Sequence, residues 1–179
     1  MRRKLISLIC ALAIAALSIS TAAAGGNVRL SNVTFGLGSL ISNGTLTGLG
    51  NTDVTVVLDA TGTPVVMCTN QGGNQAPGQN PPKVSATGIQ LLSGNDPVRK
   101  NGKSPFGAET NDPTMPSARL AGCPNDNWTA QIVFVYWTSA TITILDTNSQ
   151  AVLLKQNYVC TTVRLGPGLT NGAVTCTPA

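Results

Sequence analysis

The chain has 179 residues, no histidine and only 10% charged residues, and its formal net charge is +4. The absence of histidine excludes the Ser-His-Asp and Cys-His arrangements of nucleophilic catalysis and removes the common general base near neutral pH.

The first 24 residues have the pattern of a secretory signal peptide. Three cations precede an apolar run from Leu5 to Ser18, and Ala22-Ala23-Ala24 supplies a small-residue cleavage site. The run is too short for a membrane span, which needs ~20 apolar residues, and no later segment approaches that length. Cys10 lies inside the run rather than just after it, so lipid anchoring is not expected. We predict a single secreted or cell-surface domain over residues 25–179.

Removal of the signal peptide changes the charge balance. Eight Lys and Arg would remain against seven Asp and Glu, a net charge of +1. The basic character therefore belongs to the export signal and gives no reason to expect nucleic acid or an anionic membrane as a partner. The one basic cluster, RKNGK at 99–103, is predicted to be a solvated turn. No cofactor is predicted.

Four cysteines follow the predicted cleavage site: Cys68, Cys123, Cys160 and Cys176. An even number in an exported chain favours two disulfides over metal ligation. Four cysteines allow three pairings. We expect Cys68–Cys123 and Cys160–Cys176, because the last two flank a short turn that contains Gly-Pro-Gly.

Composition after residue 24 favours an all-β fold. One glutamate stands against 21 threonines and 15 asparagines, so β-branched and turn residues dominate over helix formers. Alternation and turn signals predict a single, disulfide-braced, immunoglobulin-like β-sandwich of roughly nine strands. The predicted segments are 27–35, 38–48, 53–60, 65–69, 83–92, a weak one at 104–110, 128–137, 139–146, 151–160 and 173–177.

Two details of this pattern make sharper predictions. The segments 53–60 and 65–69 are expected to form a hairpin around the sequence ATGTP. Residues 132–137, IVFVYW, are apolar at both alternating sets of positions, which is typical of a central strand covered on two sides. Residues 141–145, TITIL, alternate polar with apolar, so one face there should be in contact with water.

Two irregular stretches connect the strands. Residues 68–83 and 111–127 are rich in Gly, Pro and Asn, and each contains one cysteine of the first predicted pair. A disulfide between them would hold both loops at the same end of the sandwich. We interpret them first as stabilised connections, although exposed loops on rigid sheets are where binding sites often lie.

Three stretches of the chain resemble small exported bacterial proteins of unassigned function. They are LSNVTFGLGSLISNGTLTGLG near the start, CTNQGGNQAPGQNP at 68–81 and GCPNDNWTAQIVFVYWTSATITI at 122–144. The resemblance covers most of the chain after the signal peptide, and the string that begins at Cys68 is its most specific part. It implies a secreted bacterial protein and brings no catalytic residues. Cys160 and Cys176 are additions to that pattern.

Carboxylates are the remaining candidates for chemistry. A glycosidase needs two of them facing one bond, but most of those present fall at strand ends or in turns, where Asp normally serves turn geometry. Asp112 and Asp126, with neighbouring Asn amides, offer hard oxygen ligands for calcium, but without a recognised spacing. The full set is Asp53, Asp59, Asp96, Glu109, Asp112, Asp126 and Asp146.

The aromatic residues Trp128, Tyr136 and Trp137 cluster in the sequence. Exposed aromatic rings stack on the C–H faces of sugars, so these three are candidates for carbohydrate binding. The competing interpretation is that the tryptophans belong to the core, with their N–H groups hydrogen-bonded.

These observations favour a non-catalytic extracellular protein that binds a glycan or a protein, or builds a structure by self-association. A carbohydrate-binding module is the first alternative. The second alternative is a surface filament subunit assembled through sheet edges, or a carboxylate-dependent enzyme.

Overall fold

The structure, a computed structural model, describes residues 27–37, 39–166 and 171–179. These residues form two β-sheets and no helix, which confirms the predicted sandwich of about nine strands. The predicted signal peptide lies outside the described residues, and the described part contains no helix able to cross a membrane. The strands are β1 (Arg29–Gly36), β2 (Ile41–Thr47), β3 (Val54–Thr69), β4 (Gln75–Pro77), β5 (Val84–Leu92), β6 (Lys103–Glu109), β7 (Thr129–Asp146), β8 (Val152–Arg164) and β9 (Gly172–Pro178).

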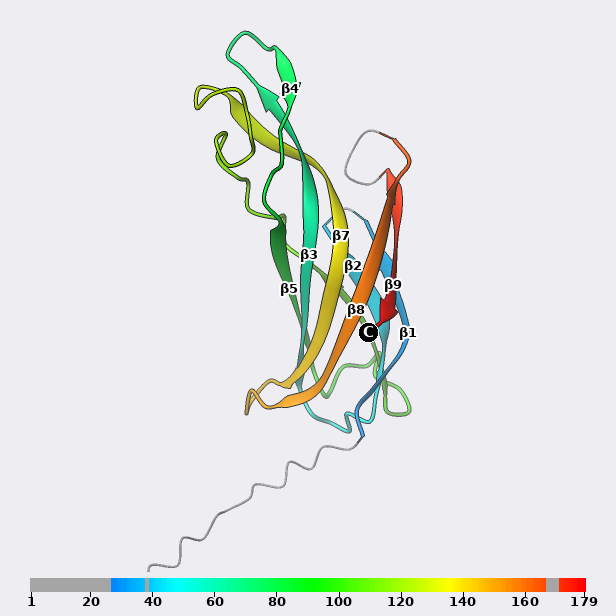
Figure 1. Ribbon diagram of the computed structural model, residues 1–179. Helices are drawn as coiled ribbons and strands as arrows, with labels where there is room; N and C mark the ends of the chain where they lie inside the picture. The colour runs from blue at the N-terminus through cyan, green and yellow to red at the C-terminus, as the bar shows by residue number, and fades with distance from the viewer. Residues whose placement is uncertain (1–26, 38, 167–170) are drawn as a thin grey trace, which may run out of the picture.

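The smaller sheet has the order β1-β2-β6, and the larger has the order β4-β3-β7-β8-β9, with β5 also paired to β3. All of these pairings are antiparallel. In Figure 1, β3 and β7 run along most of the length of the molecule, and β7 and β8 pass in front of β2.

The two sheets approach each other most closely where β5 meets β6. The Asn111 N–H donates to the Thr87 carbonyl at 3.0 Å. A Cβ on Gly88 would collide with the Glu109 carbonyl, so only glycine permits this approach of two backbones.

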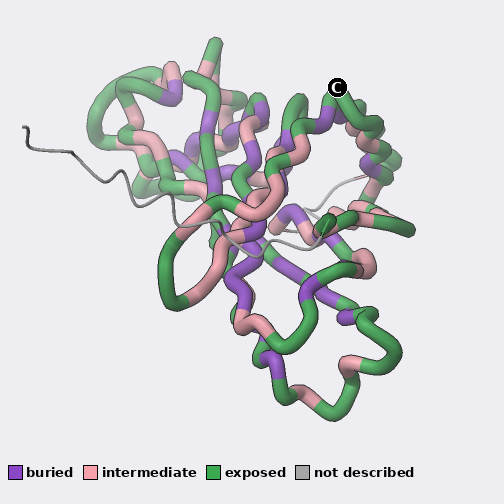
Figure 2. Tube along the Cα trace, turned by 90° about the horizontal axis from the view of Figure 1, so that it is seen from below, coloured by how far each residue is buried: buried purple, intermediate pink, exposed green. Residues whose placement is uncertain are grey.

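The core lies between the sheets. Along β3 every second residue from Val54 to Cys68 is buried. Five of them belong to one core cluster with Leu40, Leu46 and Phe106 from the smaller sheet and its flanks, namely Val54, Val56, Leu58, Ala60 and Val66. Figure 2 shows buried residues alternating with exposed ones along the strands, while the loops are exposed. Successive side chains of a strand point to opposite faces, so this alternation is expected when one face of each sheet packs against the other sheet.

The predicted hairpin within residues 53–69 is wrong, because β3 is one continuous strand of 16 residues. Gly62 and Pro64, interpreted as turn residues, lie inside it. Gly62 lies so close to Val135 and Tyr136 of β7 that an added Cβ would clash with them. Pro64 lies between the stretches of β3 that pair with β5 and with β4, an edge-like position that tolerates proline.

The connection after Cys68 also differs from its predicted irregular form. Residues 75–77 turn back along β3 as the short strand β4, with Cys68 opposite Ala76. Proline and glycine content suggested an open loop, but the turn at 70–74 folds the segment into a hairpin.

The two segments predicted at 128–137 and 139–146 are likewise one strand, β7. At two points β7 has one residue more than the β3 segment it pairs with. These additional residues are Val133 and Thr138, and each forms a β-bulge. Each extra residue reverses the alternation, so Ile132 and Trp137 both face the core although their numbers differ by five. Phe134 is buried on the opposite side, where Arg164 lies 5.3 Å from its ring centroid.

Both disulfides join the pairs that the sequence predicts. Cys68–Cys123 spans 55 residues, and Cys160–Cys176 spans 16 residues between directly opposed positions of β8 and β9. The first ties the 111–127 stretch to the end of β3. The second fixes the register of the last hairpin.

The two bridges should differ in their effect on stability. In the chain-entropy model the longer loop contributes about 4 kcal/mol and the shorter about 3 kcal/mol, because more unfolded-state entropy is removed by closing a longer loop. We expect Cys68→Ser with Cys123→Ser to lower the free energy of unfolding more than Cys160→Ser with Cys176→Ser. Urea denaturation of both double variants tests the order, and a reversed order would contradict it.

The β7–β8 turn is held by one carboxylate. Asp146 Oδ1 accepts the backbone N–H groups of Ser149 at 2.7 Å and Asn148 at 3.0 Å. These hydrogen bonds hold the pKa of Asp146 below its usual value, and the bond from the Ser149 backbone has the largest effect. A lowered folded-state pKa stabilises the fold above the unfolded pKa of about 4, and this contribution disappears as the pH falls through the folded-state pKa.

Asp146→Ala should therefore destabilise the protein near neutral pH, and the difference from the native chain should shrink below about pH 4. Urea titrations of both proteins at a series of pH values measure this difference. A difference that does not change with pH would show that the ionised carboxylate is not its cause.

Candidate functional site

The two irregular stretches lie together at one end of the sandwich. The Cys68–Cys123 bridge, with a Cα–Cα distance of 5.7 Å, joins the end of β3 to the segment that leads into β7. In Figure 1 the β3–β4 turn and the start of β7 stand side by side at the top of the molecule. The prediction that a disulfide holds both loops at one end is confirmed.

Asparagine side chains shape both turns. Asn70 Oδ1 accepts the Asn74 N–H at 2.9 Å, and Gly73 adopts a φ of +78° that suits glycine. On the facing segment, Asn125 Oδ1 accepts the Asn127 N–H at 3.0 Å. The Asn125 carbonyl accepts the Trp128 N–H at 3.2 Å. These local bonds fix where the two turns present their remaining polar groups.

Two hollows of about 230 and 360 Å³ lie at this junction and share Asn70, Gln71 and Asn127. We call them together the loop-end hollow. Its lining consists of neutral amides and hydroxyls, one glycine and one aromatic ring. The residues are Thr69, Asn70, Gln71, Gly72, Asn125, Asn127, Trp128, Thr129 and Gln131.

This lining has a definite chemical character. Amides and hydroxyls both donate and accept hydrogen bonds, so the hollow suits a ligand with many hydroxyl groups. Trp128 is half-buried, which leaves part of its ring for a ligand. None of the nine lining residues carries a charge, so a charged ligand finds no opposite charge in the lining.

Of the three predicted aromatic residues, only Trp128 lies in this hollow. Trp137 is 1% exposed and belongs to the core, so its prediction as a ligand-binding residue is wrong. Its indole N–H has no acceptor among the described residues, contrary to the usual pattern for a buried tryptophan. Tyr136 is 36% exposed and meets Phe134 edge to face at 5.0 Å.

Tyr136 is remote from the hollow along β7. It lies eight positions after Trp128, which corresponds to roughly 26 Å of extended strand. The bulge at Val133 also lies between them. The aromatic residues therefore do not form one platform, because strand geometry distributes neighbours in sequence over two faces and a long distance.

The predicted calcium ligands are not assembled into a cluster. Asp112 accepts a hydrogen bond from Ser39 Oγ at 3.0 Å, while Asp126 is exposed in the turn before Trp128. Across the described ranges, no group of three or more His, Cys, Asp or Glu side chains is placed to hold a metal ion. Asp112 serves instead to connect the 111–127 stretch to the start of β2.

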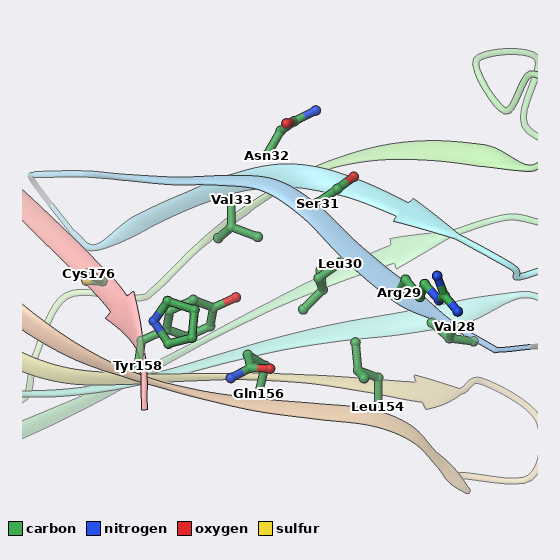
Figure 3. A pocket seen from close by; sticks show the side chains of 11 residues that line it. Val28, Arg29, Leu30, Ser31, Asn32, Val33, Leu154, Gln156, Tyr158 and Cys176 are labelled. Atoms are coloured by element: carbon green, nitrogen blue, oxygen red, sulfur yellow. The ribbon is translucent and has the colours of Figure 1, made fainter.

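The structure contains a larger groove, of about 460 Å³, that the sequence did not indicate. It lies between β1 and β8, and Figure 3 shows Leu30 and Val33 from β1 opposite Leu154 and Tyr158 from β8. Burial raises the pKa of Tyr158. The groove forms because β9 pairs with β8 only as far as Tyr158. Contacts between strands so distant in sequence leave no local pattern.

Comparisons with known proteins give little further information. No family model and no curated protein matches the chain. Two solved structures of Bacteroides uniformis beta-glucuronidase 2 are similar in part, a calcium-binding mutant (TM-score 0.27) and a form covalently bound to cyclophellitol-6-carboxylate aziridine (TM-score 0.28). Each alignment has 10% identity and covers 82% of this chain but 15% of that one. This likeness carries no argument about activity or ligand.

The two tryptophans should behave differently on truncation. Trp137→Ala should lower the free energy of unfolding by about 3–5 kcal/mol, because it removes a large side chain from the core. Trp128→Ala should cost about 1 kcal/mol or less, as is usual for partly exposed positions. Urea denaturation of the two variants measures both values. Equal losses would contradict the placement of Trp128 at a solvent-open hollow.

Proposed function

We infer that this chain is an exported, non-catalytic binding protein whose loop-end hollow binds carbohydrate. The observation that carries this inference is the half-buried ring of Trp128 among side-chain amides and hydroxyls, on loops braced by Cys68–Cys123. An aromatic face with convergent polar groups is the usual composition of a ligand site.

The chemistry of a sugar ring fits both parts of this lining. Its axial C–H groups present an apolar face to an indole ring, and its hydroxyl groups take part in hydrogen bonds as both donors and acceptors. Asn70, Gln71 and Asn127 are common to both hollows, so their amides would be shared by adjoining sugar units. A lining without charge favours neutral sugars over acidic ones.

The non-catalytic part of the proposal follows from the same residues. Hydrolysis of a glycosidic bond needs an acid and a base or nucleophile within reach of one bond. The nine residues of the loop-end hollow include no carboxylate, and the whole chain has no histidine. Binding without turnover is the function that this set of side chains supports.

Export is supported by the covalent structure. Disulfides persist in oxidising compartments, and this chain has two. The signal-peptide pattern at residues 1–24 agrees with that location. A secreted or cell-surface position would bring the loop-end hollow into contact with extracellular polysaccharides.

A glycan array probed with protein purified after export tests the proposal. We expect binding to neutral oligosaccharides, and Trp128→Ala should weaken it by at least ~10-fold, equivalent to about 1.4 kcal/mol. Tyr136→Ala is the matched control, since it removes an exposed aromatic ring outside the hollow. Binding should change little between pH 5 and 9, because no lining group titrates there. A flat response to all glycans, or equal losses in both variants, would refute the assignment.

A further inference from the structure

The groove between β1 and β8 lies beside an unpaired stretch of strand edge. β7 pairs with β8 along residues 152–159, whereas β9 pairs with the opposite edge of β8 only from Tyr158 onwards. Just beyond β9, the Ala179 N–H donates to the Asn157 carbonyl at 3.0 Å. Backbone groups of a strand alternate between its two edges, so the N–H and C=O of Lys155 point to the same edge as the Asn157 carbonyl. Within the described ranges, no strand pairs with Lys155 on that edge.

The strand β9 indicates what kind of occupant fits the groove. Its alternate residues Val174 and Cys176 pack against the core. Pro178, the next residue in this alternation, lines the groove together with Cys176. In Figure 1, β8 continues downwards past the end of β9. A further strand in line with β9 would therefore turn every second side chain into the groove.

The walls of the groove suit apolar side chains. Leu30 and Val33 of β1 face Leu154 of β8 across it (Figure 3). The volume of about 460 Å³ is within the usual range of ligand sites. β1 itself is a poor edge for pairing, because Asn32 adopts a φ of +53° and the register against β2 shifts at this point. The edge of β8 is therefore the one that can accept a strand.

Charge distinguishes a second copy from a different partner. Arg29 is the one charged residue among the eleven that line the groove, and Lys155 lies on the adjoining edge. Neither has an ion-pair partner among the described residues. A symmetric pairing of this short edge with the same edge of a second copy would bring two Lys155 ammonium groups close together on one face, which is unfavourable. Both cations favour a partner segment that carries a carboxylate.

We propose that the groove binds an extended segment of another protein, which adds to β8 as an antiparallel strand in line with β9. Its apolar residues, at every second position, enter the groove. Its backbone pairs with Lys155, and an acidic side chain on the outward face meets the Lys155 ammonium group. Strand addition takes its affinity from main-chain hydrogen bonds and its specificity from the pockets for alternate side chains. The groove shares no residue with the loop-end hollow, so this site does not depend on carbohydrate binding.

Extension of the chain tests whether the groove accepts a strand. Four residues added after Ala179, Val-Glu-Val-Thr, would place both valines in the groove and the glutamate opposite Lys155. We expect this extension to raise the urea midpoint of unfolding by roughly 0.5 M, because the added strand binds only the folded chain. The matched control adds the same residues in the order Glu-Val-Thr-Val, which exposes the valines and should give no increase. Equal midpoints for the two extensions would overturn the proposal.

A free peptide then tests the binding of a separate segment. We expect a fluorescein-labelled peptide, Thr-Val-Glu-Val-Thr-Val with blocked ends, to bind the native chain with a Kd below ~1 mM, measured by fluorescence anisotropy. Lys155→Glu should weaken this binding by ~10-fold or more, because two carboxylates then face each other, and a peptide with lysine in place of its glutamate should restore it.

The matched control is Lys83→Glu, which changes an exposed lysine outside the groove and should leave the affinity unchanged. Circular dichroism confirms that each variant is folded. Equal losses in the two variants, or no peptide binding up to ~1 mM, would contradict the assignment. Binding of dodecanoate but not of the peptide would also overturn it, since the groove would then take a small amphiphile.

Discussion

The antiparallel ladder between β3 and β7 is the interaction on which the rest of the structure depends. All 16 residues of β3 have partners on β7. β5 and β4 pair with the other edge of β3, and β8 pairs with the other edge of β7. Because β4, β5 and β8 attach directly to this pair, and β9 attaches through β8, the length of the pair sets the length of the sandwich and the position of its loop end.

Two bulges in this ladder decide what each face presents. Each inserts one residue into β7, at Val133 and Thr138, and so reverses which side chains point inwards. Trp137 thereby reaches the core, while Tyr136 stays on the opposite, exposed side. Without the extra residues, strict alternation would place Ile132 and Trp137 on opposite faces. Alternation puts the adjacent Tyr136 and Trp137 on opposite faces, and the bulges decide that Trp137 is the one that is buried.

The loop-end hollow and the side of the larger sheet that is turned away from the smaller sheet both depend on this ladder. The hollow lies where the ladder ends, and the Cys68–Cys123 bridge holds the two segments that leave it. On the side turned away from the smaller sheet, Thr141 and Thr143 are partly exposed while Ile142 and Ile144 are buried on the core side, as expected for residues 141–145.

The sequence by itself determined the class of fold, both disulfide pairs and most strands, because alternation, turn residues and cysteine spacing are local signals. It also identified Trp128 and the two irregular stretches that meet at the hollow. The continuity of β3 and β7 was decided only by tertiary structure, since Gly62 and Pro64 resemble turn residues until a long partner strand holds them extended. The burial of Trp137, the partners of Trp128 in the hollow and the groove between β1 and β8 likewise depend on segments far apart in the chain. Register and bulges bring those segments together, and no local pattern records them.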